Sequence, residues 1–353
     1  MPRAALDVPV TAPHVLATMK QTHVNARITP SGEPALAYGI AVPKSWAYSK
    51  EFGPVAREPL APRGLGFFAI STAPRSPVIA VTVTSLLFEI PIDAWAVHAM
   101  IAEGWTTVSA KWFPGPSGPF FDITGTRVVD DVEEVRRTTA RNDGPNIFCV
   151  NCMCGRDGWD AAKEIFWAAH STFELLSSTH STRIEPWLST GAETPDFQVA
   201  HPRSWSAESV LGAPEGVSAV DLRLLNAAKD KLLAYVQVKA EREERDEEPA
   251  PLDALQGRAL AKLEHAGFTP SAPMRALGED EDPRAPATDG WLGGLVGRGH
   301  LAGAEVVART GFVRRAGVVC SLSMLGPTRE DDTMTALRAQ RAFEIVRTTW
   351  ELL

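Results

Sequence analysis

Hydrophobic and polar residues alternate along several stretches of the chain, and corresponding stretches occur twice in the same order. The segments Ser76–Thr84 (SPVIAVTVT) and Asp230–Val238 (DKLLAYVQV) alternate as half-buried β-strands do. The segments Glu103–Thr106 (EGWT) and Ala266–Thr269 (AGFT) each close an apolar stretch with helical character. Because strand and helix signals recur in one order, the pattern indicates two copies of one domain.

Two further motifs recur in the same order. The pentads are Val42–Trp46 (VPKSW) and His201–Trp205 (HPRSW), and the cysteine motifs are Cys149–Gly155 (CVNCMCG) and Cys320–Gly326 (CSLSMLG). Proline cannot continue the hydrogen bonding of a sheet, so the chain is expected to turn away at each pentad. The tryptophan of each pentad is then expected to fold back over the end of the sheet and bury its ring.

The strongest match between the halves is a helical stripe. From Trp159 to Leu176 the apolar residues have helical spacing, and adding 177 to each residue number gives a second apolar set. The two sets are Ala162, Phe166, Ala169, Phe173, Leu176 and Ala339, Phe343, Val346, Trp350, Leu353.

The repeat divides the chain into residues 1–180 and 184–353, joined at Ser177–Pro195, which is rich in serine, threonine and proline as a linker is. Each half is predicted to contain alternating strands, a helix (Ile92–Gly104 or Leu252–Gly267), further strands and a closing helix. Consecutive strands joined by short turns form an antiparallel sheet, which two amphipathic helices must cover. The predicted fold class is therefore α+β, with two tandem α/β/α sandwich domains, each an antiparallel sheet covered by helices.

Charge and composition exclude several classes of partner. The 353 residues are 44% hydrophobic, and the net charge is −8. This acidic balance is unsuited to nucleic acid or anionic lipid. No apolar run reaches the roughly 18 residues of a spanning helix, so no stable membrane insertion is expected. Pro9 and Pro13 interrupt the N-terminal segment, so no signal peptide is expected, and the four cysteines are few for a secreted disulfide scaffold. These features predict a cytoplasmic location.

The cysteine motif of the first half is a candidate for a metal or redox site, since thiolates at this spacing can bind zinc or an iron–sulfur cluster. On a strand, however, Cys152 and Cys154 share one face while Cys149 points to the other. The second half keeps only Cys320 of this set. The motif therefore predicts buried strand positions, cysteine being among the most buried residue types.

The remaining sequence holds no enzyme signature. The glycine-rich stretch Trp291–His300 (WLGGLVGRGH) is followed by a strand-like stretch, which favours a β-turn or bulge over a phosphate-binding loop. The eight histidines are scattered without a metal-binding pair, and no serine lies in a GxSxG motif. The sequence thus predicts a protein that is not an enzyme, with no catalytic or metal-binding residue and no cofactor.

The opening strand and tryptophan turn, Tyr38–Phe52 (YGIAVPKSWAYSKEF), together with the strand–helix order and the long closing helix, resemble the PsbP/DcrB-like family. This family shares its α/β/α sandwich with the Ran-binding Mog protein. The second half, Phe197–Ser209 (FQVAHPRSWSAES), departs from the pattern by placing His201 before the proline, and by a long acidic insertion.

The resemblance implies a role that is mostly not enzymatic. Members of the family include extrinsic photosystem subunits, periplasmic lipoproteins, the Ran-binding protein and cytosolic effector-associated chaperones of bacterial type VI secretion. Those chaperones hold apolar effector segments and act as paired copies. A tandem chain would supply this pairing covalently.

The aromatic residues around one loop are the candidate binding site. The stretch Lys111–Phe121 (KWFPGPSGPFF) is a Gly/Pro-rich loop flanked by large apolar residues, which give binding energy at low entropic cost. The partner-binding residues predicted here are Trp112, Phe113, Phe120 and Phe121.

Two acidic runs distinguish the second half. They are Glu241–Pro251 (EREERDEEPAP) and Gly278–Pro286 (GEDEDPRAP), and the latter replaces the aromatic loop of the first half. Such runs are typical of solvated loops. A functional interpretation is an acidic rim that repels wrong partners or attracts a basic one.

The sequence therefore predicts a protein-binding module, an adaptor or chaperone for a partner protein; the resemblance points to an apolar segment of a secreted effector. One alternative is a structural or accessory subunit of a bacterial multiprotein complex. An apolar sheet face left exposed favours the chaperone, whereas sheets fully covered by helices favour the scaffold. A second alternative is a ligand-binding or enzymatic protein with a pocket between the halves. A third, a regulator of a small GTPase, rests on the analogy of fold alone.

Overall fold

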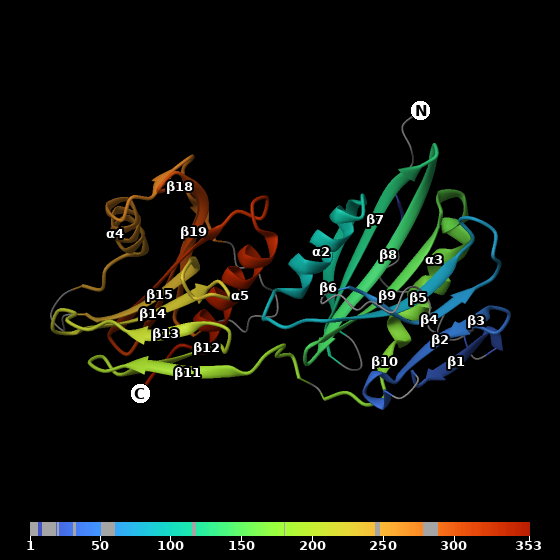
Figure 1. Cartoon of the computed structure of the whole chain (residues 1–353), viewed down its shortest axis with the longest axis horizontal. Coiled ribbons are helices and arrows are strands. Elements are labelled where there is room, and N and C mark those ends of the chain that lie inside the picture. Colours follow the sequence, from blue (N-terminus) through green and yellow to red (C-terminus); the bar gives the residue numbers. More distant parts are fainter. Residues whose placement is uncertain are drawn as a thin grey trace. The chain divides into compact units, whose positions relative to one another are not determined.

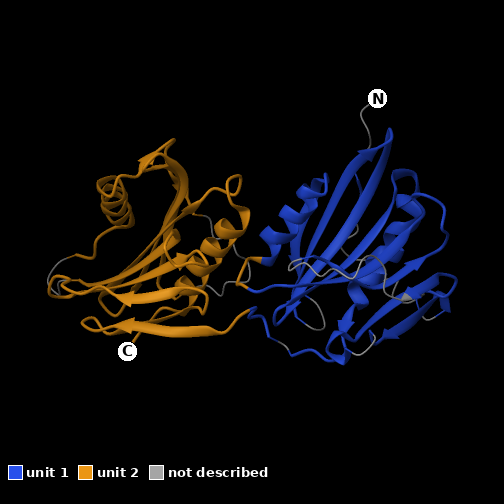
Figure 2. Cartoon of the chain, viewed as in Figure 1, with its two compact units in different colours: residues 1–87, 92–184 blue, residues 88–91, 185–353 orange. Residues whose placement is uncertain are grey.

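The chain forms two compact units in the computed structural model, which describes residues 6–8, 19, 21–30, 33–50, 61–114, 118–179, 181–243, 248–277 and 289–353. Unit 1 consists of residues 1–87 and 92–184, and unit 2 of residues 88–91 and 185–353 (Figure 2). The acidic run Gly278–Pro286 lies outside the described residues, and so does part of the run Glu241–Pro251.

Unit 1 is mostly antiparallel sheet with two long helices (Figure 1). Its elements in chain order are β1 (His23–Ile28), η1 (Pro34–Leu36), β2 (Tyr38–Pro43), β3 (Ala47–Lys50), β4 (Arg63–Ala69), β5 (Val78–Ser85), α2 (Ile92–Ala102), β6 (Thr106–Phe113), β7 (Phe120–Val129), β8 (Val132–Asp143), β9 (Asn146–Gly155), η2 (Arg156–Gly158), α3 (Trp159–Thr172) and β10 (Glu174–Leu175).

Unit 2 has the same order of strands and helices, with two short strands in place of β6. Its elements are β11 (Trp187–Ala192), β12 (Phe197–Pro202), β13 (Ser206–Ser209), β14 (Val217–Leu225), β15 (Leu232–Arg242), α4 (Leu252–His265), β16 (Thr269–Pro270), β17 (Arg275–Ala276), β18 (Trp291–Leu301), β19 (Ala304–Arg315), β20 (Val318–Pro327), α5 (Thr333–Thr349) and β21 (Glu351–Leu352).

The large sheets of the two units share one strand order. In unit 1 it is β3-β4-β5-β9-β8-β7-β6, and in unit 2 it is β13-β14-β15-β20-β19-β18-β16, with β17 also paired to β18. All of these pairs are antiparallel. The α+β class predicted from the sequence is confirmed. Each unit also has a separate three-stranded sheet, β1-β2-β10 in unit 1 and β11-β12-β21 in unit 2. The prediction of one sheet per domain is therefore incomplete, because the opening strand before each pentad belongs to this small sheet.

The helices of each unit lie on opposite faces of its large sheet. In unit 1 α3 packs against β2, β8 and β9, while α2 packs against β6, β7 and β8 (Figure 1). In unit 2 α5 packs against β12, β15 and β20, while α4 packs against β18 and β19. Glycine on β7 eases the close approach of α2, since a Cβ on Gly125 would lie 2.8 Å from Cε of Met100 and 3.1 Å from the carbonyl oxygen of Thr106.

The helical stripes predicted for α3 and α5 bury their residues at four of five positions. The fifth residues, Leu176 and Leu353, are exposed. The helices predicted to run this far end at Thr172 and Thr349, and the chain continues as the strands β10 and β21. This correction has a clear cause: Leu175 pairs with Tyr38 of β2, a partner that helical periodicity cannot reveal.

The pentads form the same turn in both units, as predicted. The N–H of Trp46 donates to the carbonyl of Pro43, and that of Trp205 to Pro202, at 3.1 and 3.0 Å. Both indole rings are buried, Trp46 at 8% exposure and Trp205 at 3%, in the hydrophobic cores of their units. The ring therefore closes the end of the core at the point where proline ends the strand.

Two other segments differ from their predicted structure. The predicted linker Ser177–Pro195 includes β11, which pairs along its whole length with β12. The glycine-rich stretch Trp291–His300 is strand β18 rather than a turn, and the predicted bulge lies at its start, where the register shifts between Trp291 and Gly293. Its glycines permit close packing: a Cβ on Gly299 would lie 2.4 Å from the Thr269 carbonyl oxygen.

The run Phe88–Pro91 follows β5 in sequence but belongs to unit 2 through the carboxylate of Glu89. This side chain is 1% exposed. It accepts hydrogen bonds from Nε1 of Trp187 at 2.8 Å and from the backbone N–H of Glu185 at 3.3 Å. Nε of Arg341, on α5, lies 3.4 Å away and supplies the compensating charge. The burial of Glu89 is thus offset by hydrogen bonds and an ion pair.

Candidate binding sites

The four aromatic residues predicted to bind a partner lie at the loop end of the β6–β7 hairpin. Trp112 pairs with Phe121 across the two strands, and Phe113 with Phe120. The ring centroids are 5.3 Å apart in the first pair and 5.8 Å in the second. Residues 115–117 of the connecting loop lie outside the described part of the chain.

The two aromatic pairs lie on opposite faces of the sheet, because neighbouring residues of a strand alternate. Trp112 and Phe121 lie on the face that carries α2, and Phe121 is buried at 5% exposure. Phe113 and Phe120 lie on the other face and are half-buried. The ammonium of Lys111 stands 4.9 Å from the centroid of Phe113, a cation–π contact. The hairpin end thus offers an aromatic surface on each side.

Strand β6 is an open edge of the large sheet in unit 1. It is eight residues long and pairs only with β7 among the strands that the structure describes. Its first residues are exposed, with Val108 at 48%. The corresponding edge of unit 2 is divided between the two-residue strands β16 and β17, and Pro270 ends the first of them. Proline has no N–H to offer a further strand, so this edge is blunted.

A buried polar cluster lies on the face of the large sheet of unit 1 that carries α3. Arg137 on β8 and Asp122 on β7 form an ion pair with Nη2 and Oδ2 2.5 Å apart, and their side chains are 2% and 4% exposed. Beside them, Oγ1 of Thr139 and Nδ1 of His170, on α3, are hydrogen-bonded at 2.9 Å. Burial and the nearby Arg137 cation hold the pKa of His170 well below its usual value of 6.5.

Acid should therefore weaken unit 1 through His170. Below about pH 6.5 the unfolded chain binds a proton at this residue and the folded chain does not, so the free energy of unfolding falls by up to about 1.4 kcal/mol for each further pH unit. We expect His170→Asn, which can still bond Thr139, to lose less stability than the wild type between pH 7 and 5.5 in urea titrations. The contributions of other titrating groups cancel in this comparison. Equal losses of the free energy of unfolding in both proteins would contradict the assignment to His170.

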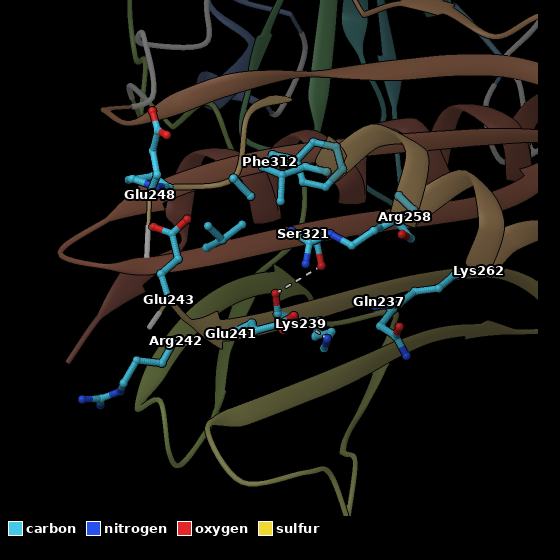
Figure 3. A pocket seen from close by; sticks show the side chains of 16 residues that line it. Gln237, Lys239, Glu241, Arg242, Glu243, Glu248, Arg258, Lys262, Phe312 and Ser321 are labelled. Atoms are coloured by element: carbon cyan, nitrogen blue, oxygen red, sulfur yellow. Dashed lines mark hydrogen bonds and ion pairs between the residues drawn. The ribbon is translucent and has the colours of Figure 1, made fainter. Parts of the chain in front are cut away.

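A cavity of about 340 Å³ lies in unit 2 between α4 and the strands β15 and β20 (Figure 3). One side, here called the apolar wall, consists of Leu255, Ala259, Phe312 and Val319, which form a hydrophobic cluster. A second group of lining residues, here called the basic wall, consists of Lys239, Arg258 and Lys262.

Polar residues complete the cavity around the basic wall. Glu241 forms an ion pair with Lys239, with Oε2 and Nζ 2.7 Å apart, and this contact lowers the pKa of Glu241. Desolvation, together with the neighbouring Lys239, lowers the pKa of Lys262. Two lysines close enough to repel each other create a site that an anion would stabilise.

The cysteines lie as the sequence predicts. All four are buried and free, and the motif of the first half is strand β9. Burial raises the pKa of Cys149 and of Cys154 to about 12, so both thiols stay protonated at neutral pH and are poor nucleophiles and metal ligands. Among the described residues, no three His, Cys, Asp or Glu side chains cluster as metal ligands. No described helix is long and apolar enough to cross a membrane.

Sequence reasoning missed the cavity of unit 2. Its strand residues alternate along β15 as Gln237, Lys239 and Glu241, and its helix residues Arg258 and Lys262 are four positions apart on α4. Each pattern alone is typical of a solvated surface. Only the pairing of β15 with β20 and the position of α4 bring the charges together.

Comparison with known proteins gives structural likenesses only. No protein family and no curated protein matches the sequence. The cyanobacterial PsbP of Synechocystis sp. PCC 6803 is similar over 42% of this chain and 91% of its own, with 11% identity and a TM-score of 0.33. The Ran-binding protein Mog1p of Saccharomyces cerevisiae is similar over 48% of this chain and 96% of its own, with 13% identity and a TM-score of 0.31.

A third similar structure spans both units. The immunity protein TplEi of the type VI secretion system of Pseudomonas aeruginosa is similar over 95% of this chain and 98% of its own, with 9% identity and a TM-score of 0.24. The solved structures thus include PsbP and Mog1p, the proteins to which the sequence resemblance points, and one protein of type VI secretion. At these identities the likenesses concern the fold alone.

Proposed function

We propose that the chain is a non-enzymatic protein-binding module built from two tandem PsbP/DcrB-like domains, residues 1–180 and 184–353. The shared strand order of the two large sheets supports the proposed duplication. In this proposal the protein works in the cytoplasm as an adaptor or chaperone for a partner such as a secreted effector. Its four free, buried thiols suit a reducing compartment.

The observation that carries the proposal is the open edge β6 with aromatic rings at its end. An edge strand presents unpaired backbone N–H and C=O groups, to which an extended segment of another protein can add as a further strand. The backbone bonds supply affinity, while side chains of the added strand contact both faces of the sheet. At the hairpin end these faces carry the half-buried Phe113 and Phe120 on one side and Trp112 on the other.

The test is a peptide-binding experiment with the full chain. A random peptide library displayed on phage is selected against the immobilised protein, and enriched peptides are titrated by fluorescence anisotropy. We expect extended sequences with alternating apolar residues. Phe113→Ala/Phe120→Ala should weaken their binding at least tenfold, or about 1.4 kcal/mol, because both rings lose contact with the added strand.

The control is Val128→Ala, which removes apolar surface at the far end of β7, where Val128 is 61% exposed. Its affinity should equal that of the wild type, and thermal melts of all variants should show retained folding. Hydrogen exchange should slow in residues 106–113 when the peptide binds, since strand addition protects backbone amides. Selected peptides that bind the double variant unchanged, with no protection in β6, would refute the proposed site.

A further inference from the structure

The cavity of unit 2 has the two surfaces that a small amphipathic ligand needs. We propose that it binds a small organic anion, with a carboxylate at the basic wall and an apolar body on the apolar wall. This site is separate from the strand-addition site on β6 and does not depend on it. The volume of about 340 Å³ lies within the range of roughly 300–1,000 Å³ found for small-molecule sites.

The walls come from different elements and converge on one space. Figure 3 shows Arg258 and Lys262 extending from α4 toward the strands, where Lys239, Ser321 and Gln237 lie. Ser321, on β20, also lines the cavity, and its hydroxyl donates a hydrogen bond to the backbone carbonyl of Lys239 at 3.4 Å. Cations from a helix and from a strand can therefore hold one carboxylate from two sides, with charge-assisted hydrogen bonds.

Around the basic wall, the described lining residues carry more positive than negative charge. Glu241 is the carboxylate that interacts with all three cations of the basic wall, and its pKa is lowered by Lys239 first and by Lys262 and Arg258 as well. At the outer end, Glu243 is paired with Arg314 at 2.9 Å, and Glu248 is exposed. Arg242 also lines the cavity, with its side chain directed away from Lys239 and Lys262 (Figure 3). Among the described lining residues, an added anion thus meets three cations at the basic wall, where Glu241 is the carboxylate beside them.

The apolar wall decides the class of anion. Leu255 and Val319 are 5% and 7% exposed, and Phe312 is 2% exposed, so the wall is the edge of a packed cluster. An inorganic anion would leave the remaining exposed part of this wall in contact with water, whereas a hydrocarbon chain or ring would cover it. A free carboxylic acid and the C-terminal carboxylate of a peptide both present this combination of groups.

The experiment titrates four probes into the full chain by calorimetry: hexanoate, its neutral analogue hexanamide, acetyl-Leu-Leu with a free carboxylate, and the same dipeptide amidated. We expect the carboxylates to bind and the amides to bind at least tenfold more weakly. Tighter binding of hexanoate identifies a free acid as the ligand source, and tighter binding of the dipeptide acid identifies a peptide C-terminus. Inorganic phosphate should bind more weakly than either.

Matched variants locate the binding. Lys262→Met removes one charge of the basic wall, and Lys231→Met removes one charge of the same sign at an exposed residue of the same unit that does not line the cavity. The first should weaken hexanoate binding at least tenfold, and the second by less than twofold. Because Lys262 is exposed, its variant should fold normally, which a thermal melt checks.

The titration of Lys262 gives an independent readout. The groups that act on Lys262 are Lys239 and Glu241 on β15 and Arg258 on α4. A bound carboxylate favours the protonated ammonium, so binding at alkaline pH should take up a proton. Calorimetry in buffers of different ionisation enthalpy measures this uptake, which Lys262→Met should abolish. Equal binding of hexanoate and hexanamide, or equal loss in both variants, would overturn the proposed site.

Discussion

Arg137→Met should lower the free energy of unfolding of unit 1 by about 3–5 kcal/mol, the cost of leaving a buried charge without its partner. Asp122 is 4% exposed, and its two carboxylate oxygens accept three hydrogen bonds from Arg137. After the substitution the carboxylate remains surrounded by sheet and helix, with no cation in place. Urea denaturation, followed by hydrogen exchange of the peptides of unit 1, measures the loss.

The double variant Asp122→Leu/Arg137→Met separates the charge from the packing. Nη1 of Arg137 has no hydrogen-bond partner among the described residues, so the native pair is only partly compensated for its desolvation. Apolar side chains of similar size are therefore expected to restore stability to within about 1 kcal/mol of the wild type. Lys163→Met, which removes ion pairs with the exposed Asp7 and Asp160, should cost less than about 1 kcal/mol. If the double variant loses as much free energy of unfolding as Arg137→Met, the packing of these side chains rather than their charge determines the stability.

Trp205→Ala should destabilise unit 2 by about 3–5 kcal/mol, as expected for truncation of a large buried aromatic side chain. Trp205 is 3% exposed and belongs to the same core cluster as Phe197 and Val199 of β12 and Val220 and Leu222 of β14. Its removal leaves a cavity where the chain turns from β12 into β13. Chemical denaturation resolved by hydrogen exchange in peptides of unit 2 provides the measurement.

Leu211→Ala is the matched control in the same unit. This side chain is 92% exposed, so its truncation should change the free energy of unfolding by less than about 0.5 kcal/mol. If both variants lose the same stability, the ring of Trp205 does not hold the core together. A loss confined to the Trp205 variant supports the role that the pentad suggests from sequence.

Local patterns predicted the parts of the fold that depend on local physics. Proline followed by tryptophan marks the end of a strand, and the structure has that turn with a buried ring at Trp46 and Trp205. Helical spacing located α3 and α5, since each must bury a stripe. The ends of these helices could not be predicted, because Phe173 and Trp350 fit a helix and also fit the short strands that follow.

The candidate sites depend on contacts between residues distant in sequence. Aromatic content identified the loop of Trp112 and Phe121, but only the sheet order makes β6 an edge. The ion pair of Arg137 with Asp122 joins two strands, and each residue alone suggests an exposed position. Such sites follow from strand register, which a single sequence specifies only through the alternation of faces.

The difference between the edges of the two large sheets limits how copies of this chain can associate. Head-to-tail growth through these sheets needs two long complementary edges, whereas β3 and β13 have four residues each and β16 and β17 two each. Among the described edges of the large sheets only β6 is long, so two copies are expected to pair through their β6 strands, in an isologous contact with twofold symmetry. Such a contact uses the β6 edge of both copies, so neither copy keeps a free β6 edge for a third one. Association through the described edges of the large sheets is therefore expected to stop at a dimer.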